Sequence, residues 1–202
     1  DYVDCGNTAA LTLGNQLSVS AWVMVPTLPG SSQWAVISKR FFFSTNTPFE
    51  LRVGASATLA VDFSCANVTG GGNLQSTMTQ TTFGAGRWRH VVGTWDGVTQ
   101  RLYIDGRLDN SKANSLSQPT NSTPVTIGAD VNGEYFNGSI DDVRIHSRAL
   151  TAADVWAVYD DARAGYPLSL NRSPAGLGYM QAVAAYRAWW AGRGSMLGGG
   201  VI

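Results

Sequence analysis

The sequence has 202 residues, of which 44% are hydrophobic and only 14% are charged, and it contains 23 glycines. Its 14 basic residues balance 14 acidic ones, which disfavours nucleic acid as the main partner, because phosphate binding needs an excess of positive charge. The length fits one large domain, or one domain with an appendage, and the chain has no apolar run of the roughly 18 residues needed to span a bilayer.

Cys5 and Cys65 are the two cysteines of the chain. They are too few for a disulfide framework or for a structural zinc site made of cysteines alone. A single disulfide and two free thiols both remain open. A bridge would require that the two strands lie side by side, with the Cα atoms within about 7 Å of each other.

Short extended runs, separated by Gly, Pro, Asn and Ser, recur along most of the chain. In the run 17–25, Leu17, Val19 and Val23 fall on alternate positions, which is the period of a strand with one buried face. Short strands at this spacing are typical of a sandwich or barrel, so the predicted fold class is all-β. The predicted strands are 17–25, 34–37, 49–53, 58–63, 88–95, 99–104, 124–128 and 136–145.

Two Asp-Gly pairs, Asp96-Gly97 and Asp105-Gly106, predict tight turns. Both residue types tolerate the positive φ that a two-residue hairpin turn requires. The stretch 110–123 is rich in Ser, Asn and Thr and predicts a loop.

One short helix is predicted in the main body, over residues 152–160. Thr151 can cap its first turn, and Asp154 lies where the helix dipole favours a negative charge. Apolar residues at helical spacing predict that the helix covers the sandwich. These residues are Leu150, Val155, Val158 and Tyr159.

The C-terminal part of the chain differs in composition from the rest. The domain division is 1–166 for the sandwich and 167–202 for a tail, and from residue 172 onward the tail has three arginines and no acidic residue. A helix over 179–191 would present an aromatic surface, which predicts a segment that docks on a protein partner or on another copy of the chain. Folding back over the sandwich is the alternative. The predicted docking residues are Tyr179, Val183, Tyr186, Trp189 and Trp190.

Several sequence stretches carry a resemblance to a known family: 2–4 (YVD), 17–25 with its AWV triplet, 88–97 (WRHVVGTWDG), 102–106 (LYIDG), 127–128 (IG), 136–145 (FNGSIDDVRI) and 148–151 (RALT). With their order and spacing, the sequence resembles the laminin-G-like, concanavalin-A-like jelly-roll family over roughly residues 1–160. The resemblance implies two packed antiparallel sheets of about six or seven strands each. It also implies that Asp1 lies inside the first strand, with more chain upstream.

No arrangement of residues for catalysis is recognisable. Related jelly rolls with β-glucanase activity carry three acidic residues at alternate positions of one strand, whereas the two glutamates of this chain, Glu50 and Glu134, stand in no acidic alternation. His90 and His146 belong to no metalloprotease motif. We therefore expect a protein without enzymatic activity.

The resemblance also implies a structural calcium ion, held by carbonyl oxygens of the first strand and an Asp of the last strand. Asp141 and Asp142 occupy the corresponding place. Because neighbouring strand residues point to opposite faces, only one of the two should reach the ion, and Asp141 is the predicted ligand. The alternative is that both are solvated or pair with Arg144 or Arg148.

A rim of loop residues is the candidate ligand site, because sugar recognition takes aromatic faces and converging polar groups. Its predicted members are Trp34, Arg40, Asn46, Asp130, Asn132 and Tyr135.

These observations predict a non-catalytic module displayed outside the cell, on a cell surface or on a virion surface. The favoured role is assembly or attachment through the tail, as in a virion decoration, surface-layer or filament component, with additional glycan contact. A lectin-like adhesion module is the first alternative. A glycoside hydrolase is the second, disfavoured by the missing carboxylates.

Overall fold

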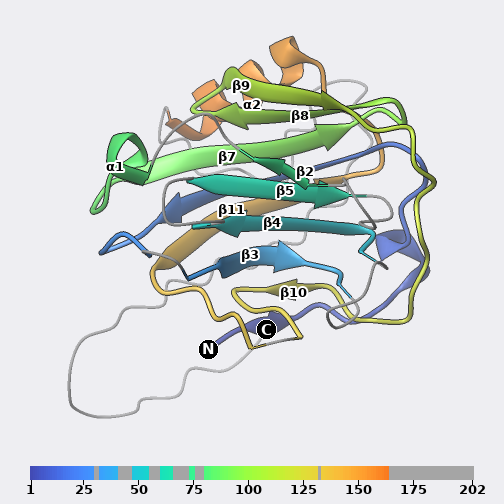
Figure 1. Ribbon diagram of the computed structural model, residues 1–202, viewed down its shortest axis with the longest axis horizontal. Coiled ribbons are helices and arrows are strands. Elements are labelled where there is room, and N and C mark those ends of the chain that lie inside the picture. Colours follow the sequence, from blue (N-terminus) through green and yellow to red (C-terminus); the bar gives the residue numbers. More distant parts are fainter. Residues whose placement is uncertain are drawn as a thin grey trace.

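The computed structural model describes residues 1–29, 32–40, 47–54, 60–65, 73–75, 80–131 and 133–163. These residues form two antiparallel sheets that pack face to face, which confirms the all-β sandwich (Figure 1). The first sheet has the strand order β1 (Val3–Asp4), β10 (Thr126–Ile127), β3 (Trp34–Ser38), β4 (Phe49–Val53), β5 (Val61–Cys65) and β6 (Asn73–Gln75). The second has the order β11 (Ser139–His146), β2 (Leu17–Met24), β7 (Trp88–Trp95), β8 (Thr99–Ile104) and β9 (Arg107–Ala113). Six and five strands are thus close to the size that the resemblance implied.

The core lies between the sheets and follows the alternation seen in the sequence. On β2, Leu17, Val19 and Val23 are fully buried, and they face apolar side chains of the other sheet. Gly93 on β7 lies directly under the ring of Phe63 on β5, so a Cβ at this position would overlap the ring. Close approach of the two sheets therefore depends on this glycine.

Both predicted hairpin turns are confirmed. Asp96 accepts hydrogen bonds from the backbone N–H groups of Val98 and Thr99, at 2.9 and 2.7 Å. Asp105 and Gly106 have φ values of 51° and 76°, the pair of positive values that a type I′ turn needs.

The helix α2 (Ala152–Arg163) starts where the sequence predicted and runs three residues further. Thr151 Oγ1 accepts the Asp154 N–H at 3.2 Å, and the Asp154 carboxylate accepts the Thr151 N–H at 2.9 Å, which is a capping box. Leu150 and Val155 form a small second core with Val92 and Tyr103 on the outer face of the five-stranded sheet. The helix therefore covers that sheet, as predicted.

Several predicted boundaries were wrong. The predicted loop 110–123 begins too early, because β9 continues to Ala113 as a polar edge strand without an apolar alternation. The strand predicted over 58–63 is β5, which starts at Val61 and ends at Cys65. The structure also contains β6, the 3-10 helix η1 (Ala9–Leu11) and the short helix α1 (Gln80–Phe83), none of which the sequence pattern indicated.

At 12 residues, α2 is the longest helix in the part of the chain that the structure describes, and none there is long and apolar enough to cross a membrane. The predicted docking tail and the predicted boundary between residues 166 and 167 lie outside the described residues.

Candidate functional site

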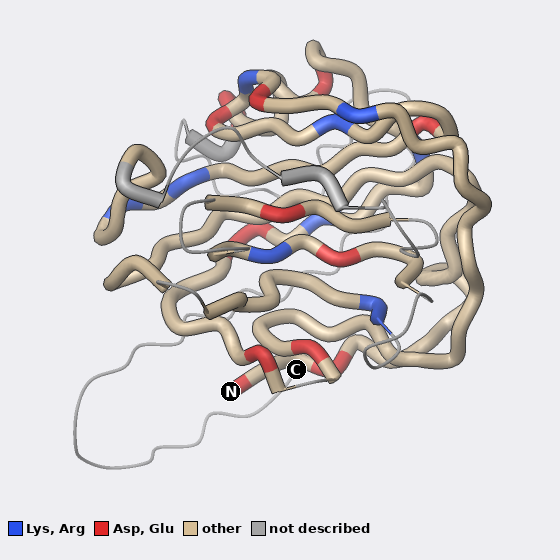
Figure 2. The backbone as a smooth tube through the Cα atoms, viewed as in Figure 1, with Lys and Arg blue, Asp and Glu red and all other residues tan. Residues whose placement is uncertain are grey.

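The outer face of the six-stranded sheet is polar and charged. On β4, Phe49, Leu51 and Val53 point into the core, so the residues between them, Glu50 and Arg52, point to the outer face. On β5 the same alternation places polar residues outward beside them. Figure 2 shows both signs of charge on neighbouring strands of this sheet.

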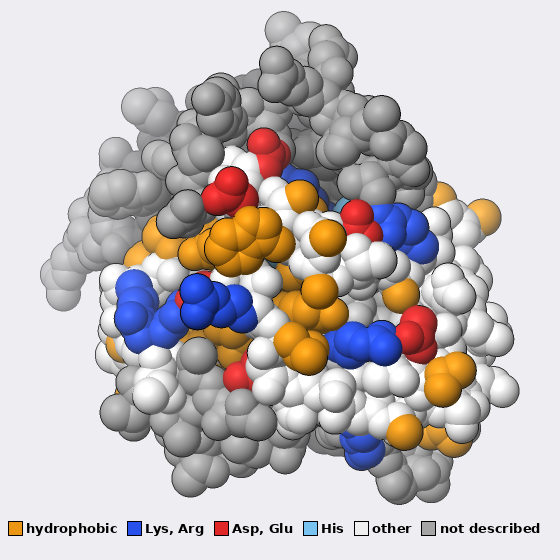
Figure 3. Space-filling view, turned by 90° about the horizontal axis from the view of Figure 1, so that it is seen from above, with side chains coloured by type: hydrophobic (Ala, Val, Ile, Leu, Met, Phe, Trp, Pro, Cys, Tyr) orange, Lys and Arg blue, Asp and Glu red, His pale blue; other side chains and the backbone are white. Residues whose placement is uncertain are grey.

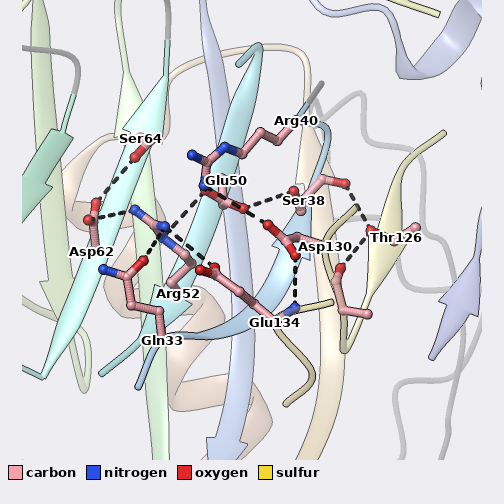
Figure 4. Close-up of polar contacts among 11 residues, drawn as sticks. Gln33, Ser38, Arg40, Glu50, Arg52, Asp62, Ser64, Thr126, Asp130 and Glu134 are labelled. Atoms are coloured by element: carbon pink, nitrogen blue, oxygen red, sulfur yellow. Dashed lines mark hydrogen bonds and ion pairs between the residues drawn. The ribbon is translucent and has the colours of Figure 1, made fainter. Parts of the chain in front are cut away.

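Arg52 is the centre of a network of ion pairs on this face (Figure 4). Its Nη2 lies 3.0 Å from Asp62 Oδ2, its Nε lies 3.4 Å from Glu50 Oε2, and its Nη1 lies 3.6 Å from Glu134 Oε2. Nη1 also donates a hydrogen bond to Gln33 Oε1 at 2.5 Å. Three carboxylates from separate segments of the chain thus meet at one guanidinium group.

Arg40 extends the network from the end of β3. Its Nη1 lies 3.4 Å from Glu50 Oε2 and 4.0 Å from Asp130 Oδ2. Glu50 Oε1 also accepts a hydrogen bond from Ser38 Oγ at 3.0 Å. Glu50 is therefore held between two arginines, and its side chain is only 1% exposed.

The loop 128–136 brings Asp130 and Glu134 over the sheet. Thr126 Oγ1 donates to the Ala129 carbonyl at 2.7 Å, and Asp130 Oδ1 accepts the Glu134 N–H at 2.9 Å. The Glu134 carbonyl in turn accepts the Ala35 N–H of β3 at 3.2 Å. These bonds fix the loop to β3, so that the Glu134 side chain reaches Arg52.

Two exposed tyrosines lie beside this loop. Tyr2 and Tyr135 are each 55% exposed, and their ring centroids are 6.4 Å apart. Tyr135 follows Glu134 in the chain, and Glu134 and Arg40 have side chains that are 25% and 17% exposed. We call Tyr2, Arg40, Asp130, Glu134 and Tyr135 the Tyr135 rim, which combines exposed aromatic surface with a partly exposed hydrogen-bond donor, Arg40, and a partly exposed acceptor, Glu134, while the Asp130 side chain is fully buried.

Burial controls the protonation of the network. It raises the pKa of Glu50 to about 7, an effect that Arg52 and Arg40 only partly offset. Burial likewise raises the pKa of Asp62 and of Glu134. Glu50 therefore exchanges its proton near neutral pH.

The structure brings together part of the predicted rim. Arg40 and Asp130 are joined by an ion pair, and Tyr135, which follows Asp130 in the same loop, is exposed. Trp34 instead packs edge-on against Phe136, at 6.2 Å between ring centroids, and against the core. Asn46 and Asn132 lie outside the described residues.

The sequence analysis did not predict several residues of the site. Period-two alternation on β4 and β5 could have placed Glu50, Arg52 and Asp62 on one face. No local signal could have brought Glu134 to Arg52, because that contact depends on the pairing of the loop with β3.

Asp141, the predicted calcium ligand, lies at a bulge where the register between β11 and β2 shifts. Its Oδ1 accepts the backbone N–H of Asp142 at 2.8 Å. Asp142 has a positive φ of 46° and pairs with Arg144 through two contacts of 2.8 and 2.9 Å. Within the described ranges no three His, Cys, Asp or Glu side chains cluster closely enough to hold a metal, and calcium binding at Asp141 stays a prediction.

A disulfide between the cysteines is not formed, which corrects that option of the sequence analysis. Cys65 ends β5, and Cys5 follows β1 and pairs by backbone hydrogen bond with Val125, so strands β10, β3 and β4 lie between them. At about 4.8 Å per strand, this spacing far exceeds the reach of a disulfide. Both are free thiols, Cys65 buried and Cys5 half-buried.

Fold and site together define a two-sheet jelly-roll sandwich with a polar, charged outer face. Comparison with family profiles matches residues 1–156 to Laminin_G_3, of the concanavalin A-like lectin/glucanase superfamily, and the chain belongs to this family. The predicted resemblance is thereby confirmed. A comparison with curated proteins found no match.

Solved structures share the fold at low sequence identity. A protein of Bacteroides ovatus ATCC 8483 assigned to carbohydrate binding has a TM-score of 0.60 and 19% identity, over 77% of this chain and 43% of that one. The binding domain of botulinum neurotoxin serotype G has a TM-score of 0.60 and 14% identity, over 80% of this chain and 40% of that one. A heptameric SAP-like pentraxin from Limulus polyphemus has a TM-score of 0.55 and 16% identity, over 78% of this chain and 81% of that one. The match thus spans less than half of the first two neighbours.

Proposed function

We propose that this chain is a non-catalytic, surface-displayed lectin-like module that binds glycans at the Tyr135 rim. The observation that carries the proposal is the pair of exposed tyrosines, Tyr2 and Tyr135, beside partly exposed polar groups that buried ion pairs hold in place. The assignment of the Bacteroides ovatus neighbour to carbohydrate binding supports the same class of ligand.

The chemistry of the rim fits a sugar. An aromatic ring packs against the apolar C–H face of a sugar, and sugar hydroxyls donate to carboxylates and accept from guanidinium groups. Arg40 supplies the donor and Glu134 the acceptor. Because Arg40 is fixed by Glu50 and Asp130, binding orders few side chains, which lowers its entropic cost.

Hydrolysis of a glycan is disfavoured by burial. A glycosidase needs two carboxyl groups that flank the scissile bond. Glu50 is 1% exposed and engaged by two arginines, so it cannot reach a sugar without breaking the network. Turnover of a polysaccharide that disappears in Glu50→Gln or Glu134→Gln would contradict a non-catalytic function.

The assembly role predicted from the tail is a separate proposal, because its residues lie outside the described part of the chain. It rests on the aromatic, acid-free composition of that segment, and it is compatible with glycan binding at the rim.

Glycan-array binding and titration calorimetry test the proposed site. We expect the wild-type chain to bind at least one glycan with a Kd in the micromolar to millimolar range. Tyr135→Ala and Glu134→Gln should each weaken that binding by about tenfold or more, the effect of losing about 1.4 kcal/mol. The control is Leu116→Ala, which changes a side chain that is exposed but outside the rim.

Absence of binding to any glycan would contradict the proposal. So would binding that both rim variants retain at wild-type strength. Circular dichroism of each variant confirms that a loss reflects the rim and not the fold.

A further inference from the structure

A concave surface lies on the other side of the molecule from the Tyr135 rim, between α2 and the start of β9. The groove has a volume of about 450 Å³, within the roughly 300–1,000 Å³ typical of ligand sites. Figure 1 places α2 and β9 at the top, away from β10 and the N-terminus. Figure 3 looks down on this end and shows hydrophobic side chains gathered at its centre, with acidic and basic side chains around them.

Trp156 provides the aromatic surface of the groove. It is 44% exposed, a large open area for a residue with so much apolar surface. Its ring packs beside Tyr159, at 5.6 Å between centroids, and Tyr159 stacks on Trp22 of β2 at 5.6 Å and 18°. Trp156 is therefore supported from below by a stack of rings and remains open above.

The turn before β9 is shaped to hold these rings. A Cβ at Gly106 would lie 2.9 Å from Tyr159 Cδ1 and 3.0 Å from Trp156 Cε3. The absence of a side chain at Gly106 thus lets the two aromatic residues pack against the turn. This packing fixes the orientation of the Trp156 ring before any ligand arrives.

Polar side chains of both signs line the same groove. Asp105 is fixed by an ion pair with Arg89 and accepts the His90 N–H at 3.1 Å. Arg107 is exposed and makes no ion pair with any residue that the structure describes. Its five N–H donors are thus available to a ligand.

A bulge in β9 positions Asp109. Tyr103 pairs with Leu108 and Leu102 pairs with Asn110, so Asp109 is the extra residue of β9. Bulges re-aim side chains and occur often beside functional sites. Here the bulge lets Leu108 and Asp109, which are neighbours in the chain, both line the groove.

From this combination we propose that the groove between α2 and β9 is a second carbohydrate-binding site, for neutral pyranose sugars. The apolar face of a sugar ring stacks on Trp156, its hydroxyls accept hydrogen bonds from Arg107, and they donate to Asp109. Two acidic side chains, Asp105 and Asp109, and two basic ones, Arg89 and Arg107, lie at or beside the groove, so their formal charges sum to zero, which favours a neutral sugar over an anionic one. The site lies on the opposite sheet from the Tyr135 rim and would make the module bivalent.

Nuclear magnetic resonance of the tryptophan indole N–H groups tests the proposal. The full chain is titrated with maltotriose, cellotriose, mannotriose and chitotriose, and with sialyllactose as the anionic comparison. We expect at least one neutral trisaccharide to shift the Trp156 resonance in a saturable manner. Trp156→Ala and Arg107→Ala should each weaken that binding by about tenfold or more.

Trp88→Ala is the matched control, because Trp88 is 42% exposed and lies on β7 outside the groove. Arg107→Ala changes an exposed side chain, so it tests the site even if Trp156→Ala unfolds. Tyr135→Ala separates the two sites, since the Trp156 shift should survive in this variant. A Trp156 resonance that no neutral trisaccharide shifts, that responds only to sialyllactose, or that responds equally in Arg107→Ala would overturn the proposal while leaving the Tyr135 rim untouched.

Discussion

Glu50 and Glu134, the only two glutamates of the chain, both contact the guanidinium group of Arg52, one from β4 and the other from the loop after β10. Asp62 contacts the same group from β5. The charge of Arg52 therefore favours the ionised form of all three acids, and the network connects the stability of the fold to the pH of its surroundings.

Glu50→Gln should make the protein more stable at alkaline pH. The pKa of Glu50 rises from 4.5 to about 7 on folding, so the folded state holds this proton more tightly than the unfolded chain. The resulting stabilisation is fully present below pH 4.5 and is lost as the pH rises through about 7. Glutamine mimics the protonated acid at every pH. The unfolding free energy of the variant relative to the wild type should therefore increase by up to about 3 kcal/mol as the pH rises from 4.5 to about 8.

Urea unfolding at a series of pH values measures this gain. Asp161→Asn serves as the control, because Asp161 is an exposed carboxylate on α2, outside the network. If the unfolding free energies of Glu50→Gln and wild type differ by the same amount at every pH, protonation of Glu50 does not contribute to stability.

His90→Leu should reduce the loss of stability in acid. Burial, with a further contribution from Arg144, lowers the pKa of His90 from 6.5 to about 3 in the folded protein. Above pH 6.5, His90 is neutral in both the folded and the unfolded state and does not affect stability. As the pH falls from 6.5 to about 3, the unfolded chain binds a proton that the folded protein does not, so the free energy of unfolding decreases. At about pH 4, the variant should therefore retain up to about 3 kcal/mol of unfolding free energy that the wild type loses.

The experiment belongs in a Glu50→Gln background, because Glu50 changes stability in the opposite direction over part of the same range. Thermal unfolding as a function of pH is the measurement. An unchanged slope below pH 6.5 would mean that His90 is already protonated, or not buried, in the folded protein.

Gly93→Ala should destabilise the sandwich by about 3 kcal/mol, the upper end of the cost of overpacking a core. The new methyl group would overlap the ring of Phe63 and force the two sheets apart. Gly14→Ala is the matched control, since a Cβ at Gly14 meets no atom within 4 Å. Equal unfolding free energies for the two variants would contradict the close approach of β5 and β7.

The tail prediction can be tested by shortening the chain. Light scattering coupled to size-exclusion chromatography compares the full chain with one that ends at Pro167, each in calcium and in chelator. We expect the full chain to associate and the shortened one to be monomeric. Monomers in both cases would show that assembly does not proceed through residues 168–202.

The sequence predicted most of the strands, because their cores alternate with period two and their hairpins carry local turn signals. β4 and β7 start and end where the pattern placed them. β9 was missed because an edge strand with exposed polar side chains leaves no apolar alternation. The predicted strand boundaries were wrong where a strand begins because it pairs with a distant strand and not because of its local composition.

The candidate site was predictable only in part. Arg40, Asp130 and Tyr135 were recognised as loop residues near the rim, and the fold brings Arg40 and Asp130 into contact. Their links to Glu50 and Arg52 follow from strand order and from the loop that folds over β3, which no short stretch of sequence encodes. The groove beside Trp156 likewise depends on how α2 lies against the turn at Gly106.

The different environments of the two thiols make the protein convenient for attaching a probe. Burial raises the pKa of both, but Cys65 is completely inaccessible whereas Cys5 is half-buried beside the N-terminal strand. A maleimide dye should therefore attach to Cys5 alone in the native state, and to both after unfolding. Because the two thiols form no disulfide, reductant can be present throughout purification without loosening the sandwich, and labelling of Cys65 then reports unfolding.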